Sequence, residues 1–61
     1  MVELGNVVKT ADGAIGAVVD WVYHGMRPGI FTIAWDETTC AGSVPPQHWT
    51  RAECAALTVL S

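Results

Sequence analysis

The sequence predicts an all-β domain of five strands with one short helical turn before the last strand. Runs rich in β-branched and aromatic residues alternate with glycine-containing turn signals along all 61 residues, and this alternation is typical of short antiparallel strands. A helix-start motif, with Thr50 and Glu53 three residues apart, precedes the final apolar run. A chain of this length makes one domain, so we expect residues 1–61 to fold as a single unit.

The first hairpin is predicted from its turn. Residues 7–10 form a β-branched run, and Asp12-Gly13 follows it, a pair that favours a tight turn because glycine accepts positive φ. Residues 15–23 are the longest extended candidate, and Gly16 inside them predicts a bulge or a bend.

Strict alternation divides the side chains of residues 15–23 between two faces. One face would carry Val19, Trp21 and Tyr23. The other would carry Val18, Asp20 and Val22. Both sets contain enough apolar residues for a core, so alternation alone leaves the inward face open.

The second half of the chain is predicted from loops and breakers. Residues 24–29 form a loop in which Pro28-Gly29 indicates a type II turn. Residues 30–35 form the next strand, and residues 36–39 are a polar tip that starts a second hairpin. One face of that strand would carry Phe31, Ile33 and Trp35.

The last part of the chain combines a proline pair with the helical turn. Because Pro45-Pro46 cannot donate ladder hydrogen bonds, the fourth strand is short or lies at an edge. The capping box predicts a helical turn that ends near Ala56, and residues 57–60 resume a strand.

Composition excludes several classes of function. The net charge is −3, and the only basic residues are Lys9, Arg27 and Arg51, so a nucleic-acid partner is not expected. Hydrophobic residues make up 51% of the chain and charged residues 15%, which favours a docking module or an oligomer. No apolar run approaches the roughly 20 residues of a membrane span.

The cysteines and the first residues bear on the compartment. The chain opens on Met1-Val2-Glu3 without the basic and apolar regions of a signal peptide. We therefore expect a cytoplasmic protein in which Cys40 and Cys54 stay reduced.

The order of predicted elements resembles that of an SH3-like barrel over essentially the whole chain. Residues 5–10, followed by the Gly-x-x-Gly and valine run of residues 13–19, are similar to the opening of KOW- and Tudor-type barrels. The resemblance implies a five-stranded SH3-like barrel.

A narrower resemblance is to the plasmid-borne type II dihydrofolate reductases, which are SH3-like barrels assembled as tetramers around a shared pore. It covers residues 5–23, 42–44 and 55–57. The family's pore-lining Val-Gln-Ile-Tyr run is matched in position only at Val44, because two prolines follow it before Gln47. The resemblance thus implies the scaffold, and the activity is kept as an alternative.

The sequence holds no complete catalytic or metal-binding signature. General acid–base catalysis needs two groups held near one substrate, and no spacing among the carboxylates and histidines secures that. A cysteine–histidine pair lacks a local group to activate either thiol. Cys40, His48 and Cys54 are spaced too widely for a zinc site. We expect no catalytic residues, no metal and no cofactor.

The aromatic residues carry the functional prediction. Trp21, Tyr23, Phe31 and Trp35 share one parity on consecutive strands, so antiparallel pairing would make them neighbours. Such a cluster is either core or a binding face, and the aromatic cage of Tudor-like barrels and the peptide groove of SH3 domains are both precedents. The carboxylates near this cluster favour a basic ligand. They are Asp20, beside Trp21, and Asp36 and Glu37, which follow Trp35.

The sequence therefore predicts a small non-catalytic module that binds a protein or peptide, with a basic partner favoured and self-association left open. The predicted binding residues are Trp21, Tyr23, Trp35, Asp36, Glu37, His48 and Trp49. The alternative is an oligomeric small-molecule-binding protein or reductase on the type II dihydrofolate reductase scaffold, with a pore lined by Val44, Gln47 and His48. Neither a membrane nor a nucleic acid is an expected partner.

Overall fold

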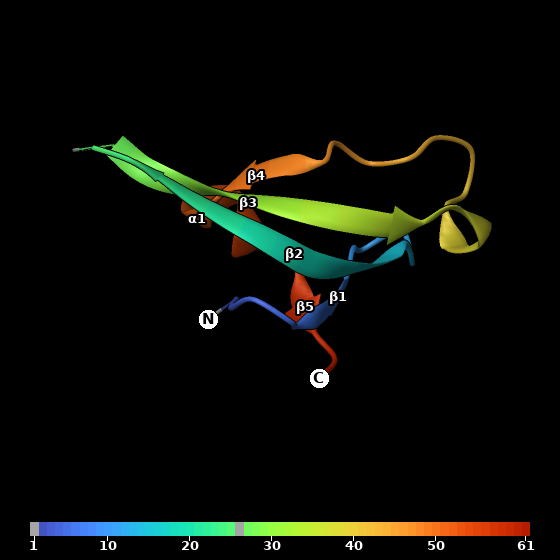
Figure 1. Cartoon of the computed structure of the whole chain (residues 1–61). Helices are drawn as coiled ribbons and strands as arrows, with labels where there is room; N and C mark the ends of the chain where they lie inside the picture. Colours follow the sequence, from blue (N-terminus) through green and yellow to red (C-terminus); the bar gives the residue numbers. More distant parts are fainter. Residues whose placement is uncertain (1, 26) are drawn as a thin grey trace.

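Five antiparallel strands form one curled, half-barrel sheet in the computed structural model, which describes residues 2–25 and 27–61 (Figure 1). The strand order is β4-β3-β2-β1-β5. The elements are β1 (Val7–Lys9), β2 (Ile15–His24), β3 (Arg27–Asp36), the 3-10 helix η1 (Glu37–Thr39), β4 (His48–Thr50), α1 (Arg51–Cys54) and β5 (Thr58–Val59). The predicted all-β architecture, with a helical turn before the last strand, is confirmed.

The first hairpin turns where the sequence predicts it. Gly13 adopts a φ of 99°, a value that an L side chain rarely takes. The Thr10 N–H donates to the Ala14 carbonyl at 2.9 Å, and the Gly13 N–H donates to the Thr10 carbonyl at 3.1 Å. These bonds close the turn and set the register in which Val8 faces Gly16.

A bulge in β2 overturns the predicted division of its faces. The register with β3 shifts between Val18 and Asp20, so Val19 is an extra residue. Directly after the extra residue, Asp20 Oδ1 accepts the Trp21 N–H at 2.8 Å. Val18, 2% exposed, and Trp21 therefore share the inner face, whereas Val19 is 56% exposed. Alternation fails here because one inserted residue inverts the faces beyond it.

The predicted turn at Pro28-Gly29 is wrong, because both residues belong to β3. The chain reverses earlier, beside Gly25 with a φ of 57°, and His24 pairs with Arg27. Met26, part of the predicted loop, lies outside the described residues. Gly29 is buried under the Trp21 ring, so its small size is needed for packing rather than for a turn.

The fourth strand is short and lies at an edge, as the proline pair predicts. β4 begins only at His48, and it pairs with β3 so that Trp49 faces Phe31. The Ile33 N–H extends the ladder by donating to the Gln47 carbonyl at 2.8 Å.

The capping box is also confirmed. Thr50 Oγ1 accepts the Glu53 N–H at 3.2 Å, and Glu53 Oε1 accepts the Thr50 N–H at 2.9 Å. The α-helix ends at Cys54, earlier than the predicted end near Ala56. The cap fixes the direction in which α1 leaves β4 and crosses the open side of the half-barrel.

Replacing Thr50 with alanine should lower the free energy of unfolding by about 1 kcal/mol, because the Glu53 N–H loses its acceptor. Urea denaturation of the variant and the wild type measures this loss. Thr58→Ala is the control, since Thr58 is an exposed threonine outside the cap. An equal loss in both variants would show that the cap is not the cause.

The core lies on the inner face of the sheet, beneath α1 and the N-terminal segment. Its buried members are Val2, Val8, Val18, Phe31, Ile33 and Cys54. Trp21, Trp35, Trp49 and Leu57 are partly buried and pack against them. Phe31, Ile33 and Trp35 therefore share the inner face, as predicted. Across the described ranges, no helix is both long and apolar enough to span a membrane.

Candidate functional site

Two aromatic rings and a guanidinium group meet on the inner face of the half-barrel. Trp21 and Phe31 pair across β2 and β3, with ring centroids 4.3 Å apart and planes inclined by 33°. Gly29, two residues before Phe31, leaves the space that the indole fills. Arg51, the first residue of α1, places Cζ 5.3 Å from the Trp21 ring centroid and 5.7 Å from that of Phe31. Both separations lie within the range of cation–π attraction.

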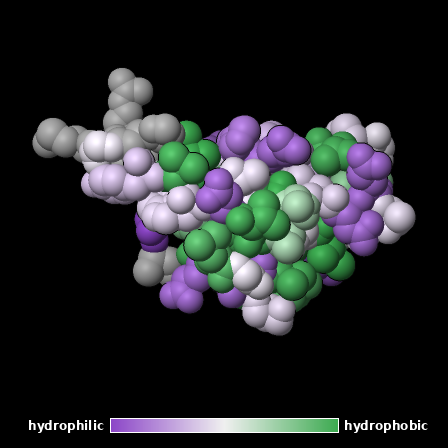
Figure 2. Space-filling model, in the orientation of Figure 1, coloured by the Kyte–Doolittle hydropathy of each residue, from purple (hydrophilic) through white to green (hydrophobic). Residues whose placement is uncertain are grey.

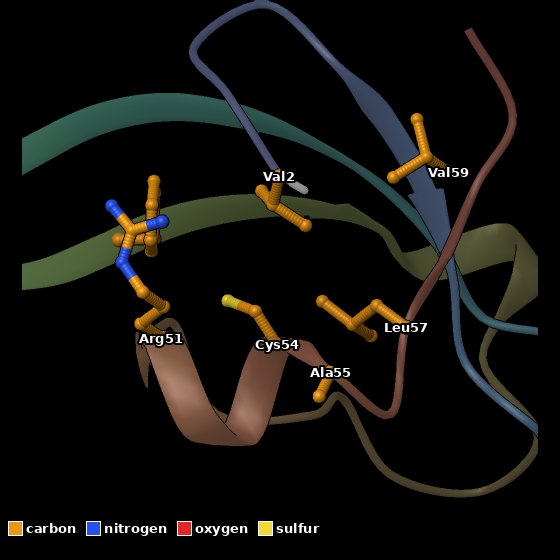
Figure 3. Close-up of a pocket in the computed structure, with 7 residues that line it drawn as sticks. Val2, Arg51, Cys54, Ala55, Leu57 and Val59 are labelled. Atoms are coloured by element: carbon orange, nitrogen blue, oxygen red, sulfur yellow. The ribbon is translucent and has the colours of Figure 1, made fainter.

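Two adjoining hollows flank this cluster and share Val2, Phe31 and Arg51 in their walls. The first has a volume of about 310 Å³ and the second of about 260 Å³. In Figure 3, Arg51 stands beside β3, Val2 hangs from the N-terminal segment, and the Cys54 sulfur points between them. We call the two hollows together the aromatic groove; its remaining walls are Glu3, Leu4, Trp21, Cys54, Ala55, Leu57 and Val59.

The groove is apolar with one charge of each sign. Its polar side chains are those of Arg51 and Glu3, and the other walls are aliphatic, aromatic or thiol groups. Desolvating an apolar side chain in such a hollow is favourable at about 25 cal/mol per Å². The site therefore suits a ligand that supplies an apolar group and tolerates a polar rim.

Trp35 and Trp49 form a second aromatic pair that is committed to the fold. Their ring centroids are 5.9 Å apart with planes inclined by 52°. Both indole N–H groups donate to the Pro46 carbonyl, that of Trp35 at 2.9 Å. The Trp35 ring also covers Gly16, where an added Cβ would lie 2.8 Å from it. Their polar atoms thus hold the segment before β4 against β3.

Tyr23 is the predicted aromatic that the structure keeps apart. It is 65% exposed, and it lies at a second register irregularity, between Val22 and His24. The predicted neighbourhood is thus realised as two pairs, Trp21 with Phe31 and Trp35 with Trp49, and Tyr23 stands outside both.

The predicted carboxylates stand apart from the groove. Asp36 caps η1, its Oδ1 accepting the Thr38 N–H at 3.1 Å and the Thr38 hydroxyl at 2.7 Å. Glu37 follows it and is exposed, and His48 is exposed on the edge strand. Asp36 lies five residues beyond Phe31 on β3, roughly 16 Å at the usual rise of a strand. The structure therefore does not bring these residues together with Trp21.

Cys54, in the wall of the groove, has a thiol pKa above its ordinary value. Burial raises the pKa of its thiol, the Glu53 carboxylate raises it further, and Arg51 opposes them. Neither Cys54 nor Cys40 is in a disulfide. Because the neutral form is favoured, nothing in this arrangement activates Cys54 as a nucleophile.

The free energy of unfolding should fall as the pH rises above 9, because the Cys54 pKa lies above its ordinary value of 9.0 in the folded state. Below pH 9 both states keep the proton and the contribution is fully present; above it the unfolded state releases the proton first. Urea denaturation between pH 8 and pH 10.5 measures the slope. The variant Cys54→Ala should lose this slope, and a slope unchanged by that substitution would assign it to another group.

Sequence reasoning missed most of the groove. The sequence singles out Arg51 only as one of three basic residues, and Val2 and Leu4 precede the first strand without any periodic signal. The capping box was the available signal, because it fixes the start of α1 and hence places Arg51 near β3. Its position over the rings depends on how α1 crosses the sheet, which local sequence does not encode.

The described residues were also compared with metal sites and with known proteins. Among residues 2–25 and 27–61, no three histidine, cysteine, aspartate or glutamate side chains gather as metal ligands would. Comparison with protein-family models, curated proteins and solved structures finds no match to this chain.

Proposed function

We propose that this chain is a non-catalytic interaction module on an SH3-like half-barrel, and that it binds a protein or peptide segment in the aromatic groove. The observation that carries the proposal is the pair of adjoining hollows beside Trp21 and Phe31, with Arg51 over both rings. Together they offer the apolar volume that a few side chains of a bound segment require.

The groove is open along one side of a sheet that does not close on itself. Val2 and Leu4 come from the N-terminal segment, Phe31 from β3, and Val59 from β5. A partner seated there would contact three separate parts of the chain and bury apolar surface on each. Large aromatic side chains next to an arginine are the residue types that dominate binding energy in protein interfaces.

The chemistry of the partner follows from the walls. An apolar side chain enters between Val2 and Phe31, while polar groups of the partner meet Glu3 and Arg51 at the rim. The expected preference for a basic partner rests on Asp20, Asp36 and Glu37. None of these three lines the groove, so the preference stays a separate prediction.

Filling the groove should abolish binding without unfolding the domain. Ala55 lines the first hollow and is exposed, so Ala55→Trp adds bulk there and removes no core contact. The probe is a peptide selected from a displayed random library against the wild-type domain and titrated by NMR. We expect the wild type to show shifts at Val2, Phe31 and Arg51, and the variant to bind at least 10-fold more weakly.

The matched control is Ala56→Trp, which adds the same side chain one residue further on, at an exposed position outside the groove walls. It should bind as the wild type does. Equal weakening in both variants, or peptide-induced shifts confined to Tyr23 and Glu37, would contradict the proposed site.

The alternative, an oligomeric small-molecule-binding protein or reductase, is favoured by one observation. Gln47 and His48 are exposed at the edge strand β4, where a second copy could approach them. Calorimetry with folate and with a nicotinamide dinucleotide tests it. Heat of binding lost in Gln47→Ala would favour the alternative, and the absence of heat from both ligands would remove it.

A further inference from the structure

The outer face of the sheet, opposite the core, carries an apolar patch. Register places Val7 beside Ala17, and Ala17 beside Ala34, in one row across three strands. The Leu60 N–H donates to the Val7 carbonyl at 2.7 Å and extends the row to the C-terminal segment. Ile15 lies on the next outward row of β2. We call this set, Val7, Ile15, Ala17, Ala34 and Leu60, the outer patch.

The outer patch is partly accessible to solvent. Leu60 is 49% exposed, Ala34 is exposed, and the other three residues are half-buried. In the orientation shared by Figures 1 and 2, α1 lies behind β2 and β3, and the surface towards the viewer carries hydrophobic residues over its middle with hydrophilic groups around them. Apolar rows on an uncovered sheet face mark an interaction surface.

Two opposite charges flank the patch symmetrically. Lys9 pairs with Ile15 on one side, and Asp36 pairs with Ile15 on the other. Ile15 therefore sits between a cation on β1 and an anion on β3, in one row. A face with this pattern is complementary to itself, because a half-turn about the direction of β2 exchanges the two sides.

We propose that the outer patch is the interface of a homodimer, in which two copies pack face to face about a two-fold axis along β2. In this arrangement Ile15 lies opposite Ile15, and Lys9 of each copy lies opposite Asp36 of the other. Val7 of each copy packs against Ala34 of the other. Isologous contacts of this kind are the commonest basis of protein dimers.

The geometry of stacked sheets accommodates the remaining charge on this face. Two packed sheets lie about 10 Å apart, and a two-fold axis along β2 keeps the two β2 strands parallel. Because the outer face of the curled sheet is convex, the two copies approach at the centre of the patch and diverge away from it. Asp20 lies on β2 beyond the bulge, past the rows that form the patch. Its Oδ1 also folds back to accept the Trp21 N–H. The two Asp20 carboxylates therefore fall where the sheets separate.

The dimer is independent of the aromatic groove, whose walls point to the inner face. Peptide binding and dimer formation can thus fail separately, and each has its own variants. An interface of two short rows is at the small end of specific interfaces, so association is expected in the micromolar to submillimolar range.

Sedimentation equilibrium of the full chain, from about 1 µM to 1 mM, tests the proposal. The wild type should dimerise, and Ala34→Arg should weaken dimerisation at least 10-fold because it places a long cation in the patch centre. Ala56→Arg is the control, since Ala56 is also exposed but lies outside the patch. A wild type that stays monomeric at 1 mM, or an Ala34→Arg variant that dimerises as the wild type does, overturns the proposal.

Charge reversal tests the two-fold arrangement itself. Lys9→Glu sets like charges against each other twice per dimer, so we expect dimerisation to weaken about 10-fold or more at low salt. The double variant Lys9→Glu/Asp36→Lys should restore dimerisation, although η1 loses the cap that Asp36 provides. Recovery can only come from the restored charge pairs, because loss of a cap strengthens no interface. The arrangement is overturned if this double variant is folded by circular dichroism yet dimerises no more tightly than Lys9→Glu. Lys9→Glu/Asp36→Asn keeps a capping side chain at residue 36, and in that case it should show no partial recovery of dimerisation either.

Discussion

Replacing Gly29 with alanine should displace the Trp21 ring and lower the free energy of unfolding by about 1–3 kcal/mol, the usual cost of overpacking. A Cβ at residue 29 would overlap three atoms of the indole six-membered ring, Cη2, Cζ2 and Cζ3. The ring cannot simply turn aside, because Phe31 lies 4.3 Å away on one side and Arg51 covers the cluster. Urea denaturation measures the loss, and near-UV circular dichroism reports the displaced indole.

The double variant decides whether the indole is the cause. In a Trp21→Leu background the space above Gly29 is open, so adding alanine there should be neutral or stabilising by up to about 1 kcal/mol, since alanine suits a strand better than glycine. Non-additivity of this size identifies a direct contact. If Gly29→Ala costs the same in both backgrounds, backbone strain and not the ring would explain the loss.

Gly29 also shows where local sequence rules stop. Pro28-Gly29 is a strong turn signal by composition, yet both residues lie in β3. The actual reversal beside Gly25 needs positive φ, and that requirement has the same sequence signature as the need for space at Gly29. Only the position of Trp21 on the neighbouring strand separates the two uses of glycine, and that position depends on the register.

The register in turn depends on a bulge that has no reliable sequence signal. Gly16 was the expected site, but the shift lies between Val18 and Asp20. At Gly16 the strand continues, and the glycine is needed because Ile33 and Trp35 leave no room for a side chain. Strand runs, the Asp12-Gly13 turn and the capping box could be predicted because each is fixed within a few residues. The faces of β2 could not.

In the candidate site, too, local features could be predicted from the sequence and features set by tertiary packing could not. Pairing of Trp21 with Phe31 was predictable, since both fall on adjacent strands of one hairpin. Whether they face inward or outward was not predictable. In the structure both lie on the inner face and line the groove. Arg51 comes from a helix that is 20 residues away in sequence from Phe31, so no local pattern predicts its approach.

Replacing Ile33 with alanine should cost about 2–5 kcal/mol, the range for large-to-small substitutions at sites that cannot collapse. Ile33 is fully buried and is among the largest of the fully buried side chains. A domain of this size has a total stability of roughly 3–9 kcal/mol. The variant should therefore be partly or wholly unfolded at 37 °C, as thermal denaturation followed by circular dichroism would show.

Ile30→Ala is the matched control, because it removes the same atoms from the same strand on the opposite face, where Ile30 is only half-buried. It should cost about 1 kcal/mol, since the side chain already contacts solvent and leaves no closed cavity. Equal losses at the two positions would mean that the outer face is as well covered as the core, in the monomer itself. A large difference fixes the inner face as the side that holds the fold together, and leaves the outer face of β2 and β3 free for contacts with another molecule.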